Sequence, residues 1–163
     1  MSDQEGVRRR DVLKGIGVTG AAVGMATTAA VVSFTARSVL IAHVGDTRVY
    51  ELGGEGTTLL TTDDRSTAGG STLTQALGGP SLEPQPTPHL TRLACEPALR
   101  FLLCTDGVNA CLDQPALGQL VRAHVDDAEL VGVILTEVLA AGAPDNVTVF
   151  VIRVGGEGSG VDE

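Results

Sequence analysis

The 163-residue sequence predicts an α+β fold, with strands along most of the chain and a pair of helices near its C-terminal end. Residues 27–33 and 38–52 are rich in the β-branched and apolar side chains that favour strands. Residues 113–141 instead repeat apolar side chains at helical spacing. Because strands and helices do not alternate along the chain, a doubly wound parallel sheet is disfavoured.

The segments between these elements alternate apolar runs with turn residues. Residues 63–89 are rich in Gly, Pro, Ser and Thr and are expected to be mostly loop, with a short turn around residues 73–77. The last strand, at residues 147–154, is a run of Val, Phe and Ile and is expected to be buried on both faces. The other strands are expected at residues 57–62, 90–93 and 100–105.

Both helices have recognisable ends. Asp113 and Pro115 give the first helix a start, because proline is tolerated in a first helical turn. The second helix is expected from about Asp127 to Ala141, and Gly142 supplies its C-terminal stop. The tail at residues 155–163 is expected to be disordered.

The composition limits the partners and the chemistry. The chain carries a net charge of −9 and its basic run is confined to Arg8-Arg9-Arg10, so nucleic acid is disfavoured because phosphate binding needs a basic face. Cys95, Cys104 and Cys111 show no C-x-x-C spacing, which argues against a zinc site and a disulfide framework and favours a reducing compartment. Aromatic residues make up only 2% of the chain, so we expect an aliphatic core.

Two interpretations of the N-terminal segment, residues 1–24, remain open. Arg9-Arg10-Asp11-Val12-Leu13-Lys14 matches a twin-arginine export pattern, and the Gly/Ala-rich residues 15–32 follow it. The alternative is an internal helix that leads into the first strand. We favour the second interpretation and a cytoplasmic protein, because cleavage near Ala30 would remove part of that strand.

Three short strings each place an aspartate at the end of a predicted strand or just before one. They are Ala42-His43-Val44-Gly45-Asp46, Leu103-Cys104-Thr105-Asp106-Gly107 and Pro144-Asp145-Asn146-Val147-Thr148-Val149. A strand end holds a carboxylate rigidly, and hard divalent cations prefer carboxylate oxygens. The sequence therefore makes Asp46, Asp106 and Asp145 candidate metal ligands.

Each aspartate also has an ordinary structural explanation. Asp106 can cap the turn before the following helix, and Asp145 can form an Asx-turn. Asp46 can be a turn residue that pairs with Arg48. The chain's three histidines are interpreted as structural residues: His43, His89 and His124.

In their order, these strings resemble those of the metal-dependent PP2C-type (PPM) protein serine/threonine phosphatases. The similarity extends from about Met25 to Val154, so the domain is expected at residues 25–154. It includes Leu60-Thr61-Thr62-Asp63-Asp64, where the family has L-T-x-D-H, and Leu73-Thr74-Gln75-Ala76-Leu77-Gly78. The motifs are individually weak, but their order is specific. The resemblance implies an antiparallel β-sandwich flanked by helices.

The resemblance also implies an activity and its cofactors. In the family, a pair of Mn²⁺ or Mg²⁺ ions activates the water that attacks phosphoserine or phosphothreonine in a protein substrate, so no side chain is expected to be the nucleophile. Carried over by position, Asp106 and Asp145 match two of the metal ligands. Asp46 matches the acid of the family's G-D-S-R motif, which contributes to a third, weaker metal site in some bacterial members.

The chain departs from the family pattern near its start. The D-G-x-G-G motif, whose aspartate bridges both metals, does not occur in the 163 residues. We therefore expect a fold truncated at the N-terminal side, an incomplete metal site and exposed sheet edges that a partner chain could cover. The alternatives are a catalytically inactive PP2C-like binding or regulatory module and an exported small domain.

Overall fold

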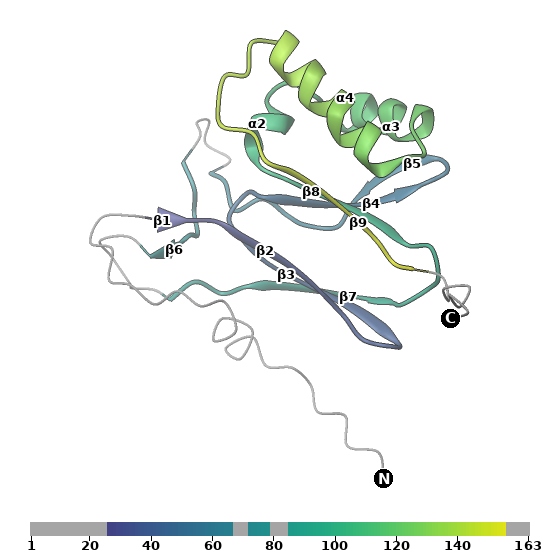
Figure 1. Ribbon diagram of the computed structural model, residues 1–163. Helices are drawn as coiled ribbons and strands as arrows, with labels where there is room; N and C mark the ends of the chain where they lie inside the picture. Colours follow the sequence, from purple (N-terminus) through teal and green to yellow (C-terminus); the bar gives the residue numbers. More distant parts are fainter. Residues whose placement is uncertain (1–25, 67–71, 79–84, 156–163) are drawn as a thin grey trace, which may run out of the picture.

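The computed structural model describes residues 26–66, 72–78 and 85–155, which form two larger antiparallel sheets, a two-stranded pair, a short helix and two longer helices packed on one of the larger sheets (Figure 1). The predicted N-terminal segment at residues 1–24 and the tail beyond Gly155 lie outside the described residues. In chain order the elements are β1 (Ala26–Thr27), β2 (Ala29–Phe34), β3 (Ser38–Val44), β4 (Arg48–Gly53), β5 (Gly56–Leu59), β6 (Leu77–Gly78), β7 (His89–Ala94), β8 (Arg100–Cys104), α2 (Asp106–Asn109), α3 (Gln114–Ala123), α4 (Asp127–Ala140) and β9 (Val149–Arg153).

Seven of the strands form two sheets that face each other, and β1 and β6 form a separate antiparallel pair. One sheet has the order β2-β3-β7 and the other the order β5-β4-β8-β9, and every pairing is antiparallel. Helices α3 and α4 cover the outer face of the four-stranded sheet (Figure 1). This arrangement confirms the predicted α+β class, an antiparallel sandwich flanked by helices. Among the described residues, no helix combines the length and the apolarity needed to cross a membrane.

The strand content predicted at residues 38–52 is confirmed as two strands, β3 and β4, and Asp46 lies in the turn between them. Gly45 adopts a φ of +101° at this turn, in the region that glycine enters without steric cost. A Cβ at Gly45 would also stand 2.3 Å from the side chain of Thr28. The turn therefore needs glycine for two reasons, and it places Asp46 between the two sheets' central strands.

The helix boundaries follow the predicted capping residues closely. The Asp113 side chain accepts a hydrogen bond of 2.9 Å from the backbone N–H of Ala116 at the start of α3. Asp126 caps α4 in the same way, accepting from Glu129 N–H at 2.8 Å. Gly142 follows the end of α4 with a φ of +95°, the left-handed conformation in which helices commonly end.

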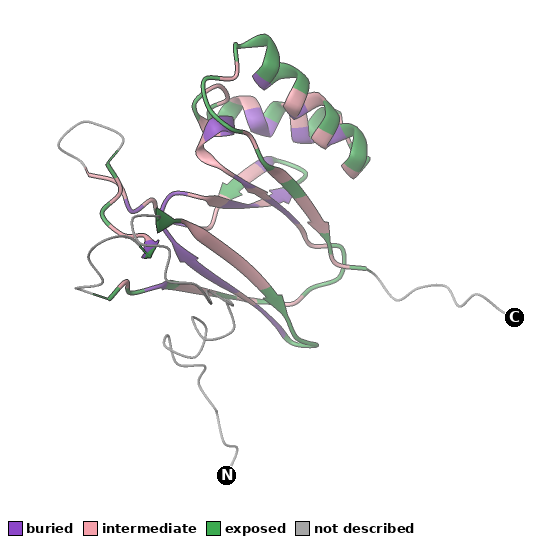
Figure 2. Cartoon of the chain, turned by 60° about the vertical axis from the view of Figure 1, so that its left-hand side comes forward, coloured by how far each residue is buried: buried purple, intermediate pink, exposed green. Residues whose placement is uncertain are grey.

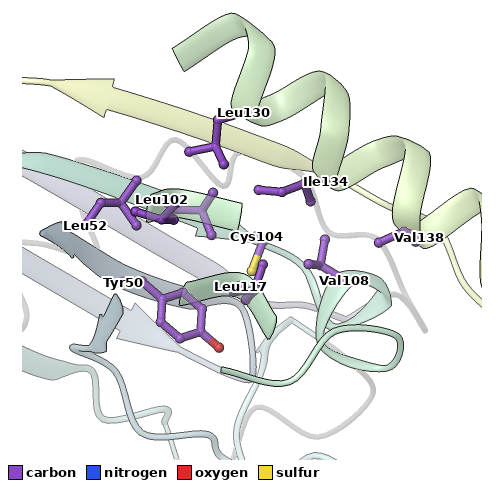
Figure 3. Packing of buried hydrophobic residues seen from close by; sticks show 10 residues of the cluster. Tyr50, Leu52, Leu102, Cys104, Val108, Leu117, Leu130, Ile134 and Val138 are labelled. Atoms are coloured by element: carbon purple, nitrogen blue, oxygen red, sulfur yellow. The ribbon is translucent and has the colours of Figure 1, made fainter. Parts of the chain in front are cut away.

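Two apolar clusters hold the layers together. Val39, Ile41, Val49 and Phe101 fill the space between the sheets. A larger cluster joins the four-stranded sheet to the helices, and its members include Tyr50, Leu52, Leu102, Cys104, Val108, Leu117, Leu130, Ile134 and Val138 (Figure 3). Figure 2 shows the buried residues on the strands and on the inner helix faces, with exposed residues on the outer faces of α3 and α4.

The core is mostly aliphatic, as expected, but its two largest fully buried side chains are the aromatic Tyr50 and Phe101, and Cys104 lies in it as a free thiol. Burial raises the pKa of Cys104 to about 11, so the side chain stays protonated and behaves as a small apolar group. The other two cysteines, Cys95 and Cys111, are also free.

The prediction that the last strand is buried on both faces is wrong. Strand β9 is the outer strand of its sheet and pairs with β8 alone among the described residues. Phe150 on β9 is 59% exposed. The apolar run indicated a buried strand, but the position of a strand within its sheet depends on pairing that the local sequence does not encode. Whether a partner chain covers such an edge stays a prediction.

Candidate metal centre

The three aspartates predicted as metal ligands line one pocket, with a volume of about 410 Å³. It lies where the β3–β4 turn, the start of α2 and the segment before β9 meet. The remaining residues that line it are Arg48, Asp63, Arg65, Asn109, Ala110 and Pro144. Four carboxylates and two guanidinium groups therefore face this pocket, which leaves it with a negative formal charge.

Asp106 and Asp145 are brought together by a close approach of two backbone segments. A Cβ at Gly107 would stand 2.4 Å from the carbonyl oxygen of Asn146, so only glycine permits this contact. Hydrogen bonds join the same segments, from Thr105 N–H to Thr148 O at 3.1 Å and from Thr148 N–H to Thr105 Oγ1 at 3.0 Å. The start of α2 is therefore fixed against the segment that carries Asp145.

The two carboxylates differ in their surroundings. Asp106 is the first residue of α2, where a negative charge is favoured, and its side chain is 42% exposed. Asp145 is exposed, and its Oδ1 accepts a hydrogen bond of 2.7 Å from the N–H of Asn146. Among the described residues, neither expected local role is present: the N-cap of α2 is Thr105, without a side-chain capping bond, and the Asp145 bond reaches the next residue rather than the second one on, as an Asx-turn requires.

Asp46 is buried at the same pocket and forms an ion pair with Arg65. The prediction that it pairs with Arg48 is wrong. Arg48 instead donates to both oxygens of Asp63, at 2.9 Å and 2.8 Å. These hydrogen bonds raise the pKa of Arg48, so its guanidinium stays charged. Asp46 lies only two residues from Arg48 in the sequence, but this closeness did not indicate that the Arg48 side chain reaches Asp63 instead.

Arg65 is the residue that sequence reasoning missed. Its Nη2 also lies 2.6 Å from Asp106 Oδ2, so one guanidinium bridges Asp46 and Asp106. Arg65 follows the Leu60-to-Asp64 string directly, but no residue pattern there indicated that it turns into the pocket. An internal cation therefore contacts two of the three predicted metal ligands.

A second hydrogen-bonded chain connects the pocket to the core. Arg48 Nη1 donates to Tyr50 Oη at 3.2 Å, and Tyr50 Oη donates to Asn109 Oδ1 at 2.8 Å. Burial raises the pKa of Tyr50, so its hydroxyl remains a donor. Tyr50 thus links Arg48 and Asn109, which both line the pocket.

A family model described as protein phosphatase 2C matches residues 20–140 of the chain. The serine/threonine protein phosphatase PstP of Mycobacterium tuberculosis is 31% identical over 149 residues, which covers 80% of this chain and 28% of the relative. The chain thus spans between a quarter and a third of the length of the curated relative that it matches.

Solved structures agree with these matches. The catalytic domain of PstP in complex with two manganese ions has a TM-score of 0.64 and 29% identity, covering 80% of this chain and 60% of that chain. PppA, a regulatory component of the type VI secretion system in Pseudomonas aeruginosa, has a TM-score of 0.70 and 25% identity, covering 88% of this chain and 62% of that one.

Proposed function

We propose, from the premise that this chain belongs to the protein phosphatase 2C family, that it is a metal-dependent phosphatase domain for phosphoserine or phosphothreonine in proteins. The observation that supports the proposal is the convergence of Asp46, Asp106 and Asp145 at one pocket. These residues come from three segments far apart in the sequence, and the fold has no need to gather three carboxylates for packing alone.

The donor atoms of the pocket suit Mn²⁺ or Mg²⁺. Both cations prefer carboxylate oxygens, and Mg²⁺ commonly uses one or two protein carboxylates, with water and substrate phosphate completing its ligands. Asp106 and Asp145 would supply those carboxylates, with Asp46 as a further ligand. A cation bound there would lower the pKa of water and neutralise negative charge on the phosphoryl oxygens.

The chain's own residues would position the substrate. Arg65 is 28% exposed and holds Asp46 and Asp106 side by side, so it fixes the carboxylate oxygens of the pocket. Its positive charge also reduces the repulsion between the acidic pocket and an incoming phosphoryl group. Arg48, held by Asp63 and Tyr50, adds a second fixed positive charge at the pocket wall.

Hydrolysis of a phosphothreonine peptide by the purified chain, with and without Mn²⁺, tests this proposal. We expect Mn²⁺-dependent turnover that the Asp106→Asn and Asp145→Asn substitutions reduce by at least ~100-fold, since removing a charge-stabilising group typically costs 10²–10³ in rate. Glu137→Gln, an exposed acid on α4, is the matched control and should turn over like the original chain. Turnover that survives loss of both aspartates would contradict the proposed site.

A second candidate function is a catalytically inactive phosphoprotein-binding module. The Arg65 bridge favours it, because a guanidinium already contacts the Oδ2 atoms of Asp46 and Asp106. In this case the folded chain would bind the phosphothreonine peptide in the presence or absence of Mn²⁺ and release no phosphate. The same assay, with peptide binding measured in parallel, therefore separates the two functions.

A further inference from the structure

Three potential metal ligands gather away from the aspartate pocket. They are His43 on β3, Asp64 in the segment after β5, and His89 at the start of β7. One ligand atom from each lies within 4.8 Å of the others. The sheet itself sets the histidine pair, since His43 and His89 are direct partners in the β3–β7 register and their ring centroids are 5.7 Å apart.

His43 is the member of this cluster that packing does not explain. Side chains alternate along a strand, so His43 lies on the same face of β3 as Val39 and Ile41, which belong to the core between the sheets. It is only 2% exposed, and neither ring nitrogen has a hydrogen-bond partner among the described residues. Buried polar groups are normally hydrogen-bonded, so this imidazole calls for a partner.

Hydrogen bonds hold the Asp64 carboxylate in place, as they do for carboxylates that bind metals. It is 6% exposed, and its Oδ2 accepts a hydrogen bond of 2.8 Å from the N–H of Gly45. Its Oδ1 lies 2.8 Å from both Gln75 Nε2 and His89 Nε2. Gln75 is itself fixed, because its Oε1 accepts from the N–H of Thr87 at 2.7 Å. Such outer hydrogen bonds orient a ligand before the metal arrives.

The cluster is open to solvent on one side. The His89 side chain is 43% exposed, and a pocket of about 210 Å³ is lined by both histidines together with Thr61 and Thr91. Asp64 does not line this pocket, so a cation would enter past the exposed His89 ring to reach His43 and Asp64.

From this geometry we propose that His43, Asp64 and His89 form a zinc-binding site separate from the aspartate pocket. Two imidazole nitrogens and one carboxylate oxygen are the donors of open, three-ligand zinc sites, whereas Mg²⁺ and Mn²⁺ favour oxygen alone. This proposal departs from the sequence analysis, where the absence of C-x-x-C spacing argued against a zinc site, because that spacing concerns cysteine ligands alone and the donors here are histidine and aspartate. The histidines interpreted as structural become ligands because the β3–β7 register places them opposite each other.

Equilibrium dialysis of the full chain against Zn²⁺ tests the site, with visible absorption of Co²⁺ as a second readout of the ligand geometry. We expect the chain to bind one equivalent of Zn²⁺. His89→Ala should raise the Kd for Zn²⁺ by more than about tenfold, because losing even a residue that only hydrogen-bonds a metal ligand typically costs 10–100-fold in metal affinity. His124→Ala is the matched control, because His124 lies at the end of α3 and bonds the Leu120 carbonyl instead.

A double variant, Asp106→Asn with Asp145→Asn, should keep the bound zinc and the Co²⁺ absorption band. Because His89 is exposed, the circular dichroism of the His89→Ala variant should match that of the original chain, which separates loss of a ligand from loss of the fold. The inference is overturned if no stoichiometric zinc binds, if His89→Ala binds it unchanged, or if the double variant loses it. The last result would assign the zinc to the aspartate pocket.

Discussion

Replacing Arg65 with alanine should strengthen the binding of Mn²⁺ to the aspartate pocket. In the folded chain, the Arg65 guanidinium bridges Asp46 and Asp106, so a divalent cation must compete with it for the same carboxylates. Alanine removes the competing charge and leaves Asp46, Asp106 and Asp145 free to face the cation.

The size of the effect follows from the exposure of the two pairs. An exposed ion pair contributes about 0.2–1 kcal/mol, and the pair with Asp106, which is 42% exposed, belongs in that range. The Asp46 carboxylate is only 9% exposed, so its pair is screened less. Together the two pairs oppose cation binding by about 1–2 kcal/mol, which corresponds to a Kd for Mn²⁺ about 5–30-fold lower in Arg65→Ala.

Isothermal titration calorimetry with Mn²⁺ measures this change directly. Arg122→Ala is the matched control, since Arg122 donates to the Glu55 carbonyl at 2.8 Å and does not line the pocket. Arg65→Lys should lie between the original chain and Arg65→Ala, because lysine keeps the charge but not the bidentate shape of the guanidinium. An unchanged or higher Kd in Arg65→Ala would refute the competition.

Two further predictions concern the stability of the fold. Gly107→Ala should lower the free energy of unfolding by about 1–3 kcal/mol, because the added Cβ would stand 2.4 Å from the Asn146 carbonyl oxygen. The control is Gly132→Ala, which should be neutral or stabilising because a Cβ there meets nothing within 4 Å. Urea unfolding measures both variants. Hydrogen bonds, chiefly the one from Arg153, lower the pKa of Asp127 below 3.8 in the folded chain. The stability that the Asp127 carboxylate contributes is therefore present above pH 4 and is lost as the pH falls through the folded pKa. Asp127→Asn should therefore flatten the fall of Tm below pH 4, and an unchanged slope would contradict this role.

The elements that depend on local chemistry could be predicted well. The helix starts near Asp113 and Asp127 and the glycine stop at Gly142 rest on capping and backbone preferences that a few neighbouring residues decide. The prediction that the last strand is buried on both faces failed, because the place of β9 in its sheet depends on pairing with segments far away in the chain.

The sequence by itself determined the α+β class, the helix start at Asp113, the stop at Gly142 and the three strings that carry Asp46, Asp106 and Asp145, because each depends on residues adjacent in the chain. Only the tertiary structure decided that Arg65 bridges Asp46 and Asp106 and that His43 lies opposite His89. Those contacts depend on strand register and on the path of a loop. Both are set by packing between segments far apart in sequence, and no local pattern of residues encodes them.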